Sequence, residues 1–286
     1  MKQRFAIFTF SLAALLLAGG CAGTLKPALE YPAARKAEVF DDYHGTRVAD
    51  PYRWLEDAES EETRAWVAAQ NLLTRKFLDG ELRDKIKARI RQLWDYPRYS
   101  SPRKRGSLYF YSKNDGLQDQ AVIYVQEGLS GKPRVLIDPN RLSTDGTVAL
   151  TGLAFSHEGS MVAYLTSSKG SDWQEIKVRK VDSGEDFPEV LQYCKFTSVA
   201  WVHDGSGFYY NSFPDPQTVA PEDRNFYSRV YLHRLGTPQS QDELVHQNPD
   251  DKERGFYPLV SDDGKYLVLH VGRGTEPKNR VYYRKV

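Results

Sequence analysis

The chain has 286 residues with 39 basic and 38 acidic side chains, and its formal net charge of +1 argues against a nucleic-acid or anionic-membrane surface, which needs a basic excess. Tyr is abundant and Met is rare, at 18 and 2 residues, which favours strands over a helical bundle. The length is sufficient for one large all-β domain or for two ordinary domains.

The N-terminus is predicted to carry a signal peptide, residues 1–20. Two basic residues precede the apolar stretch Phe5–Leu17, whose thirteen residues are too few for a membrane span of about 20. Small residues then lead directly to Cys21, as in a bacterial lipobox, although Ala18 stands where a large aliphatic residue is usual. We expect Cys21 to be a lipidation site; the alternative is ordinary signal cleavage near Ala22.

A lipid on Cys21 would anchor the protein on the periplasmic side of the bacterial cell envelope. The outer membrane is favoured because Ala22 is not the Asp that retains such proteins at the inner membrane. The alternative cleavage would give a soluble periplasmic or secreted protein. Lipidation would also leave Cys194 without a disulfide partner. Cys194 lies in the strand-like run Leu191–Phe196, so we expect a buried apolar side chain and not a reactive thiol.

Residues 21–30 are expected to form a tether, and residues 31–97 a largely helical N-terminal segment. The stretch Asp41–Asp57 is rich in aromatic residues, and turns are predicted at His44-Gly45 and Asp50-Pro51. Such an extended piece could bury its aromatic side chains against another domain but would be a poor fold by itself.

Two amphipathic helices are predicted inside this segment. The first has Ser60 as its N-cap and Gly80 as its stop, and its apolar face consists of Trp66, Gln70 or Ala69, Leu73 and Phe77. The second runs from about Glu81 to Trp94, before Pro97, and its apolar face consists of Leu82, Ile86, Ile90 and Leu93. Its basic residues are diluted by acidic ones and lack interleaved aromatics. We therefore expect a solvated face and not a nucleic-acid patch.

From Ser101 onward the hydrophobic period changes from helical to two, which is typical of strands. The predicted strands are Leu108–Tyr111, Ala121–Val125, Arg134–Ile137, Leu153–Ser156, Met161–Ser167, Gln174–Val181 and Glu189–Tyr193. The last four are expected to form one four-stranded antiparallel blade.

Three hairpin turns organise this region: Ser156–Gly159, His203–Gly205 and Asp262–Gly264. In each, Gly follows an acidic residue, and the turn lies between two apolar runs. This pattern predicts a hairpin, because the turn needs a residue with positive φ and Gly adopts that conformation freely. The glycines lie 46 and 59 residues apart, and a repeat of about 40–50 residues is typical of β-propeller blades. The wider spacing is explained by a proline-rich loop, Phe213–Asn225. Residues 98–286 are thus predicted to form an incomplete propeller of about four blades.

The last predicted blade breaks off in mid-strand at Val286. Blades bury their faces against neighbours in a ring, so an unclosed arc leaves two exposed flanks. We therefore expect the sequence to be a fragment of a longer protein.

No catalytic, cofactor-binding or metal-binding residue is predicted in the chain. The Gly-x-Ser-x-Gly elbow of α/β-hydrolases is absent, and the near matches Gly128–Gly131 and Gly205–Gly207 fall in hairpin turns. The histidines lack the spacing of zinc motifs and are expected to be structural or exposed. They are His44, His157, His203, His233, His246 and His270.

Six collinear stretches carry a resemblance. The longest is Asp41–Asp57, DDYHGTRVADPYRWLED, and the others are Gly116–Gln120, Leu136–Asn140, Gly170–Trp173, Ala200–Gly205 and Leu235–Ser240. From about Tyr31 to Val286 the chain closely resembles the prolyl oligopeptidase family of serine peptidases.

The resemblance implies a seven-bladed propeller inserted into an α/β-hydrolase domain. Residues 31–97 would then be the N-terminal part of that domain, and the catalytic Ser-Asp-His triad would lie beyond Val286. The family hydrolyses short peptides on the carboxyl side of proline, and its propeller restricts access to the site. This chain alone is therefore expected to be inactive, with no cofactor, and the missing hydrolase part as its partner. The alternative is a non-catalytic periplasmic propeller lipoprotein that binds a protein or glycan.

Overall fold

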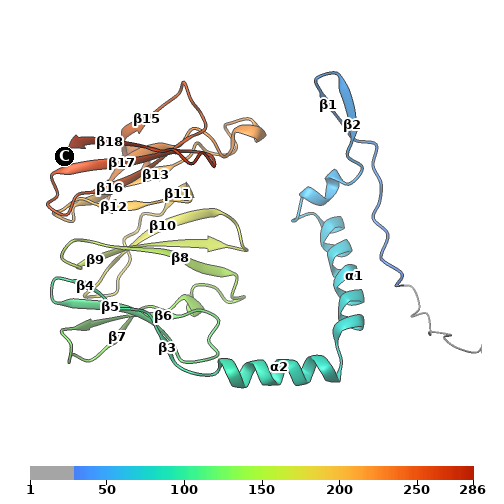
Figure 1. The fold of residues 1–286 in the computed structure, drawn as a ribbon, viewed down its shortest axis with the longest axis horizontal. Coiled ribbons are helices and arrows are strands. Elements are labelled where there is room, and N and C mark those ends of the chain that lie inside the picture. The colour runs from blue at the N-terminus through green and yellow to red at the C-terminus, as the bar shows by residue number, and fades with distance from the viewer. Residues whose placement is uncertain (1–28) are drawn as a thin grey trace, which may run out of the picture. The chain divides into compact units, whose positions relative to one another are not determined.

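The computed structural model describes residues 29–286, which divide into two compact units. The first unit ends at Arg89, and the second comprises Ile90–Val286. Figure 1 labels the helices and strands of both. The predicted signal peptide, the lipidation site Cys21 and most of the predicted tether lie outside the described residues.

The first unit begins with a small hairpin. Its elements are β1 (Phe40–Tyr43), β2 (Thr46–Ala49), η1 (Arg53–Glu56) and α1 (Glu61–Leu78). The hairpin turns at the predicted His44-Gly45, where both residues have positive φ. The Arg53 guanidinium binds Asp41 on β1 and also Asp50, with Nε 2.9 Å from the Asp50 carboxylate. Within the stretch that the sequence predicted to be extended, this cation therefore holds η1 against the β1–β2 hairpin.

Helix α1 begins as the sequence predicts. The Ser60 hydroxyl accepts a hydrogen bond from the Thr63 N–H at 3.2 Å, which satisfies one of the free donors of the first turn. Trp66 and Leu73 on the predicted apolar face are partly buried, and the Trp66 ring meets Trp54 edge-on at 6.5 Å.

The predicted role of Gly80 as the C-cap of α1 is wrong. The helix ends at Leu78, and Asp79 caps it in an extended conformation that needs no glycine, with its N–H on the Arg75 carbonyl at 2.8 Å. The Gly80 carbonyl instead accepts from the Asp84 N–H at 3.1 Å and so begins the next helix.

Helix α2 (Glu81–Trp94) has the predicted bounds and contains the boundary between the units. The side chains of its predicted apolar face are all more than half exposed: Leu82, Ile86, Ile90 and Leu93. No helix in residues 29–286 is both long and apolar enough to cross a membrane.

The second unit consists of four antiparallel sheets, which we number as blades 1 to 4. Blade 1 contains β3 (Arg98–Tyr99), β4 (Arg103–Arg105), β5 (Leu108–Asn114), β6 (Val122–Glu127) and β7 (Arg134–Ile137), followed by η2 (Pro139–Arg141). Blade 2 contains β8 (Val148–Phe155), β9 (Met161–Ser168), β10 (Trp173–Lys180) and β11 (Leu191–Lys195). Blade 3 contains β12 (Val199–Trp201), β13 (Gly207–Ser212), β14 (Arg229–Arg234) and β15 (Glu243–Gln247), with η3 (Pro221–Asp223) and η4 (Gln239–Gln241) in its loops. Blade 4 contains β16 (Arg254–Val260), β17 (Tyr266–Arg273) and β18 (Arg280–Lys285).

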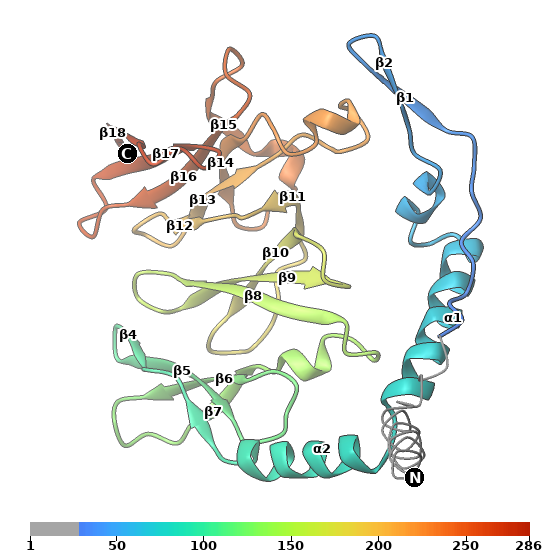
Figure 2. The same cartoon turned by 45° about the vertical axis from the view of Figure 1, so that its right-hand side comes forward.

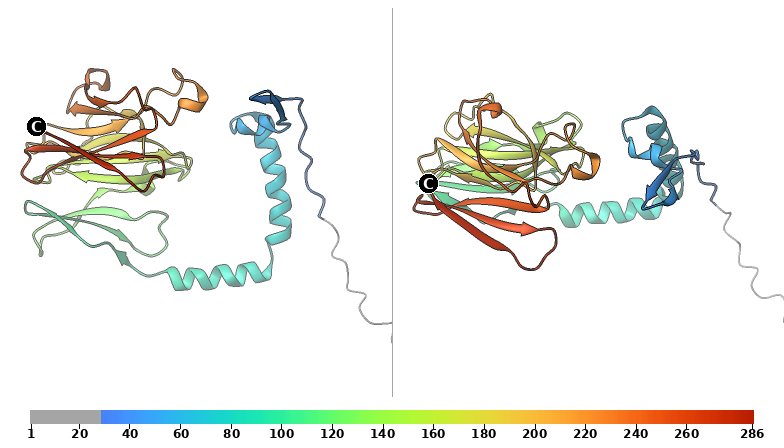
Figure 3. Two further views of the ribbon diagram at one scale, coloured as in Figure 1. Left: turned by 45° about the horizontal axis from the view of Figure 1, so that its top comes forward. Right: turned by 90° about the horizontal axis from the view of Figure 1, so that it is seen from above.

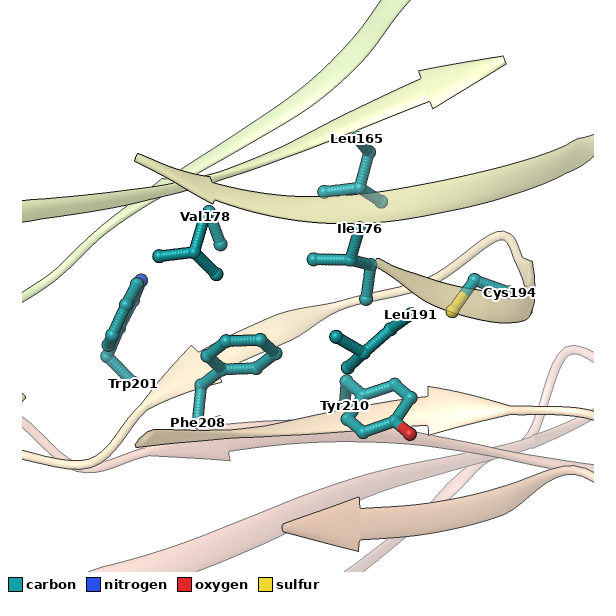
Figure 4. Close-up of a cluster of buried hydrophobic side chains, with 9 residues drawn as sticks. Leu165, Ile176, Val178, Leu191, Cys194, Trp201, Phe208 and Tyr210 are labelled. Carbon is teal, nitrogen blue, oxygen red and sulfur yellow. The ribbon is translucent and has the colours of Figure 1, made fainter. Parts of the chain in front are cut away.

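The blades pack face to face in chain order, as Figures 2 and 3 show. A separate apolar cluster fills each of the three interfaces between consecutive blades. Figure 4 shows the cluster between blades 2 and 3, where Ile176 and Leu191 of blade 2 meet Phe208 and Tyr210 of blade 3. The first strands of blades 2, 3 and 4 lie side by side, β8 beside β12 and β12 beside β16. The four sheets do not close into a ring, so the fold is a partial β-propeller, mainly β as predicted.

Several strand boundaries differ from the prediction, most of them by one to three residues, and β8 and β11 have shifted starts. Strand β8 begins at Val148 and not at Leu153, because a bulge near Thr151 lets it pair with β9 along its full length. Strand β11 covers Leu191–Lys195 and not Glu189–Tyr193; Glu189 precedes the strand, and its side chain accepts a hydrogen bond from the Gly236 N–H of blade 3.

Candidate functional site: a rim of hairpin turns

The three predicted hairpin turns have the same backbone geometry. In each, the glycine N–H donates to the residue three earlier: Gly159 to Ser156 at 3.0 Å, Gly205 to Val202 at 3.0 Å, and Gly264 to Ser261 at 2.8 Å. The three glycines have φ values of +77°, +75° and +70°, which side chains adopt only with strain. The predicted turn chemistry is thus confirmed.

The turns of consecutive blades contact one another in a row, together with the β4–β5 turn of blade 1. A Cβ on Gly159 would lie 2.9 Å from Arg105 Cβ, which places the turn of blade 2 against that of blade 1. The His157 and His203 rings, with centroids 4.0 Å apart, join the turns of blades 2 and 3. A Cβ on Gly264 would lie 2.5 Å from His203 Cβ, so the turn of blade 4 abuts that of blade 3.

This row of turns, which we call the rim, borders a cavity of about 670 Å³. The first strands of blades 2, 3 and 4 line it, so the cavity lies on the side where those strands meet. Its ionisable lining residues carry both signs of charge and are Arg103, Lys104, Arg105, His157, Glu158, His203 and Asp262. The rest of the lining is mainly apolar and comes from the first strands of blades 2, 3 and 4, including Phe155, Trp201 and Leu259. A concave surface that combines apolar side chains with a few charged groups is typical of a binding cavity.

Two carboxylates at the rim are held ionised by their own turns. The hydroxyl and the N–H of Ser206 lower the pKa of Asp204. The Ser261 hydroxyl, with help from Lys265, lowers the pKa of Asp263 to about 2. Because hydrogen bonds to a carboxylate favour its charged form, both groups remain fixed negative charges at neutral pH.

Sequence reasoning missed an aromatic group at the opposite end of blade 2. Tyr193 and Phe196 have positive φ values of 59° and 48°, and the Phe196 side chain is 64 % exposed. Lys195 places its ammonium group near the Trp173 and Phe196 rings, 5.4 and 5.6 Å from the ring centroids, and Phe213 packs edge-on against Trp173. Strained non-glycine residues cluster at functional sites. No local sequence pattern signalled these φ values.

The histidines that the sequence left as structural or exposed are placed as follows. His233 is fully buried and bonds the Asp242 carboxylate through Nδ1 at 2.8 Å. His246 packs edge-on against Phe256, and His44 occupies the β1–β2 turn. In residues 29–286 no cluster of three or more His, Cys, Asp or Glu could hold a metal ion.

Cys194 is buried between blades 2 and 3, as predicted, and its side chain carries no disulfide. Burial raises the pKa of its thiol to about 12, so it is present as a thiol at neutral pH. The near matches to a nucleophile elbow lie between strands, at β6–β7 and β12–β13, as predicted. The cavity at the rim is therefore a candidate passage and has no assigned catalytic residue.

Comparison with known proteins gives consistent results. Residues 31–286 match the sequence model of the prolyl oligopeptidase N-terminal β-propeller domain. The chain is 38 % identical to a prolyl endopeptidase of Elizabethkingia meningoseptica over 258 residues, covering 90 % of this chain and 36 % of the relative. It is 35 % identical to prolyl oligopeptidase A of Amanita bisporigera, covering 88 % of this chain and 37 % of the relative.

Solved structures agree. A structure from an analysis of two prolyl endopeptidases superposes with a TM-score of 0.79 at 36 % identity, over 90 % of this chain and 38 % of that one. Prolyl oligopeptidase B of Galerina marginata, bound to a 35-residue hydrolysis and macrocyclization substrate, gives 0.74 at 27 % identity, over 90 % and 39 %. The chain thus spans little more than a third of the length of these relatives. It belongs to the prolyl oligopeptidase family and corresponds to that family's N-terminal β-propeller region.

Proposed function

We propose that the chain is the N-terminal and propeller part of a serine-type prolyl oligopeptidase that hydrolyses short peptides on the carboxyl side of proline. The observation that carries this proposal is the extent of the family match, residues 31–286, which includes the segment before the first blade. A propeller that merely binds a partner has no use for that segment and its two helices.

The exposed apolar faces of the helices support the same proposal. Leu82 and Ile90 on α2 and Phe77 on α1 belong to the predicted apolar faces and are all more than half exposed, and large exposed apolar side chains that gather on one face mark an interaction site. We assign residues 31–97 to the peptidase domain and residues 98–286 to the propeller. The remainder of the peptidase domain would then cover these helices.

The propeller would act as the gate of this enzyme. The cavity at the rim is lined by charged side chains of both signs and by apolar residues of the first strands, whereas the aromatic group around Phe196 lies at the other end of blade 2. An extended peptide can pass such an opening, but a folded protein cannot. Gating of this kind would restrict the substrates to short peptides.

The chemistry would be acyl transfer. A serine attacks the carbonyl carbon on the carboxyl side of proline, a histidine takes the serine proton and gives it to the leaving amine, and an aspartate orients the imidazole. Backbone donors stabilise the oxyanion. No residue of this chain is assigned to the triad, so we expect the 286-residue chain alone to be inactive.

The experiment uses the intact protein, by which we mean the proposed full-length enzyme that contains this chain. It compares two substrates: a chromogenic dipeptide ending in proline, and a folded protein with exposed prolines. We expect hydrolysis of the dipeptide, loss of activity with a serine-directed phosphonate or fluorophosphonate, and no cleavage of the folded protein. An intact protein that leaves the dipeptide uncut would contradict the peptidase assignment. Cleavage of both substrates at similar rates would contradict the gate.

We also propose that Cys21 carries a lipid anchor that holds the enzyme on the periplasmic side of the envelope, at the outer membrane. The support is the sequence pattern around Cys21. The membrane would then be a partner only through the lipid.

A further inference from the structure

The turn between β14 and β15 of blade 3 reaches over to blade 2. It contains Leu235–Ser240, one of the stretches that carries the family resemblance, and the proposed gate gives it no role. The Gln239 side-chain oxygen accepts from the Gln192 N–H at 2.9 Å, and its Nε2 donates to the Gln192 carbonyl at 3.1 Å. A single side-chain amide thus bonds both backbone groups of one residue on strand β11.

Strand β11 is the edge of blade 2 that is remote from β8. An unpaired edge exposes backbone donors and acceptors and is a weak point of a sheet. By satisfying both groups of Gln192, Gln239 takes the place of a neighbouring strand at this point. The partner comes from another blade, so the bond joins two sheets that share no backbone ladder.

A second bond between the same blades lies beside the first. Glu189, on the connection between β10 and β11, accepts the Gly236 N–H at 2.7 Å through Oε1. The Glu189 side chain is almost fully buried, and its Oε1 lies 3.6 Å from His233 Nε2 of β14. A hydrogen bond in such a buried setting is electrostatically stronger than an exposed one.

Buried groups of blade 3 hold Gln239 in this orientation. The Tyr210 hydroxyl donates to Asp242 at 2.7 Å and accepts from Gln239 Nε2 at 3.1 Å. Asp242 is further bonded to the Nδ1 atom of His233 at 2.8 Å. Burial, followed by the Asp242 charge, raises the pKa of Tyr210, so its hydroxyl keeps the proton that it donates. The network within blade 3 therefore fixes the orientation in which the Gln239 side-chain amide faces blade 2.

We propose that residues 235–242 form a clasp that locks blade 3 to the outer edge of blade 2. The apolar cluster of Figure 4 lies between the same two blades, so the clasp closes an interface that is already packed. Blades 2 and 3 then move as one unit. In the proposed enzyme, any parting of the propeller that admits a substrate takes place at other blade pairs.

The test is hydrogen–deuterium exchange on the intact protein, which does not depend on peptidase activity. Gln239→Ala removes both bonds to Gln192, and in the peptide that covers β11 we expect the Gln192 amide to exchange roughly tenfold faster, because it loses the acceptor that Gln239 supplies. Gln241→Ala is the matched control, because Gln241 is exposed on the same turn. It should leave β11 unchanged.

Variants of Glu189 provide a second measurement, the exchange of the Gly236 amide, with less risk to folding. Glu189→Gln keeps an oxygen that accepts from Gly236, so exchange at Gly236 should stay within about twofold of the unmodified protein. Glu189→Ala removes the acceptor and should raise that exchange several-fold. The proposal is overturned if Gln239→Ala and Gln241→Ala give the same β11 exchange. It is also overturned if all four blades lose protection equally, since that would indicate lower global stability and no local clasp.

Discussion

Substituting Gly264 by Ala tests whether the hairpin turns pack against one another as a rim. A Cβ at this position would lie 2.5 Å from His203 Cβ and 2.8 Å from Cγ of the same ring. Real Cβ atoms do not approach so closely, so the two turns would have to move apart. Gly264 also has a φ of +70°, a conformation that strains any residue with a side chain.

The equivalent turn of blade 3 supplies a matched control. Gly205 has a φ of +75°, but no atom lies within 4 Å of the Cβ that alanine would add. Gly205→Ala should therefore cost only the backbone strain, about 1–2 kcal/mol. Gly264→Ala should add the cost of overpacking, about 1–3 kcal/mol, and reach about 2–5 kcal/mol altogether. The difference between the two variants measures the contact between turns.

The assay is guanidinium unfolding of the intact protein, with the midpoint and slope measured for both variants. We expect unchanged slopes and a clearly lower midpoint for Gly264→Ala than for Gly205→Ala. Equal midpoints would refute the reasoning, because they would mean that the turns of blades 3 and 4 do not touch in solution.

Three further predictions concern single side chains. Burial holds the pKa of the Cys194 thiol at about 12, above the unfolded value of 9.0, so the stability that this thiol contributes is complete below pH 9 and is lost as the pH rises to about 12. At pH 8, Ellman's reagent should label Cys194 in urea but not in the native protein, and rapid labelling of the native protein would contradict the burial of this side chain. The pKa of the Asp263 carboxyl is lowered from 3.8 to about 2, so the stability that this carboxylate supplies is present above pH 3.8 and is lost as the pH falls to about 2. Ser261→Ala should raise the pKa of Asp263 in an NMR titration, and an unaltered titration would refute the role of the Ser261 hydroxyl in lowering it. Cys21→Ser should move the protein from the membrane fraction to the soluble periplasm, and unchanged fractionation would rule out the lipid anchor.

Local chemistry accounts for what the sequence predicted well. The hairpin turns follow from glycine at a position that needs positive φ, and α1 begins where Ser60 can cap it. Helix α2 has the predicted bounds because its apolar period is regular along its length. The four blades follow from the repeat of such local signals.

Two of the features that the sequence did not predict depend on contacts between blades. Nothing near Gln239 in the sequence indicates that its amide meets Gln192, which is 47 residues away. The pairing of His157 with His203 likewise requires two turns to lie at the same end of neighbouring sheets. Gly80 was misassigned because Asp79 caps α1 in an ordinary extended conformation, which has no glycine signature. Long-range register, and not local propensity, decides the contacts of Gln239 and of the two histidines.

The most direct test of the central claim is the site at which the intact protein cleaves a peptide of about ten residues that contains one internal proline. Mass spectrometry of the products identifies the bond that is broken. We predict a single cleavage on the carboxyl side of the proline, abolished when that proline is replaced by alanine. An uncut peptide, or cleavage at the same bond after the replacement, would contradict the assignment of this propeller to a prolyl-specific peptidase.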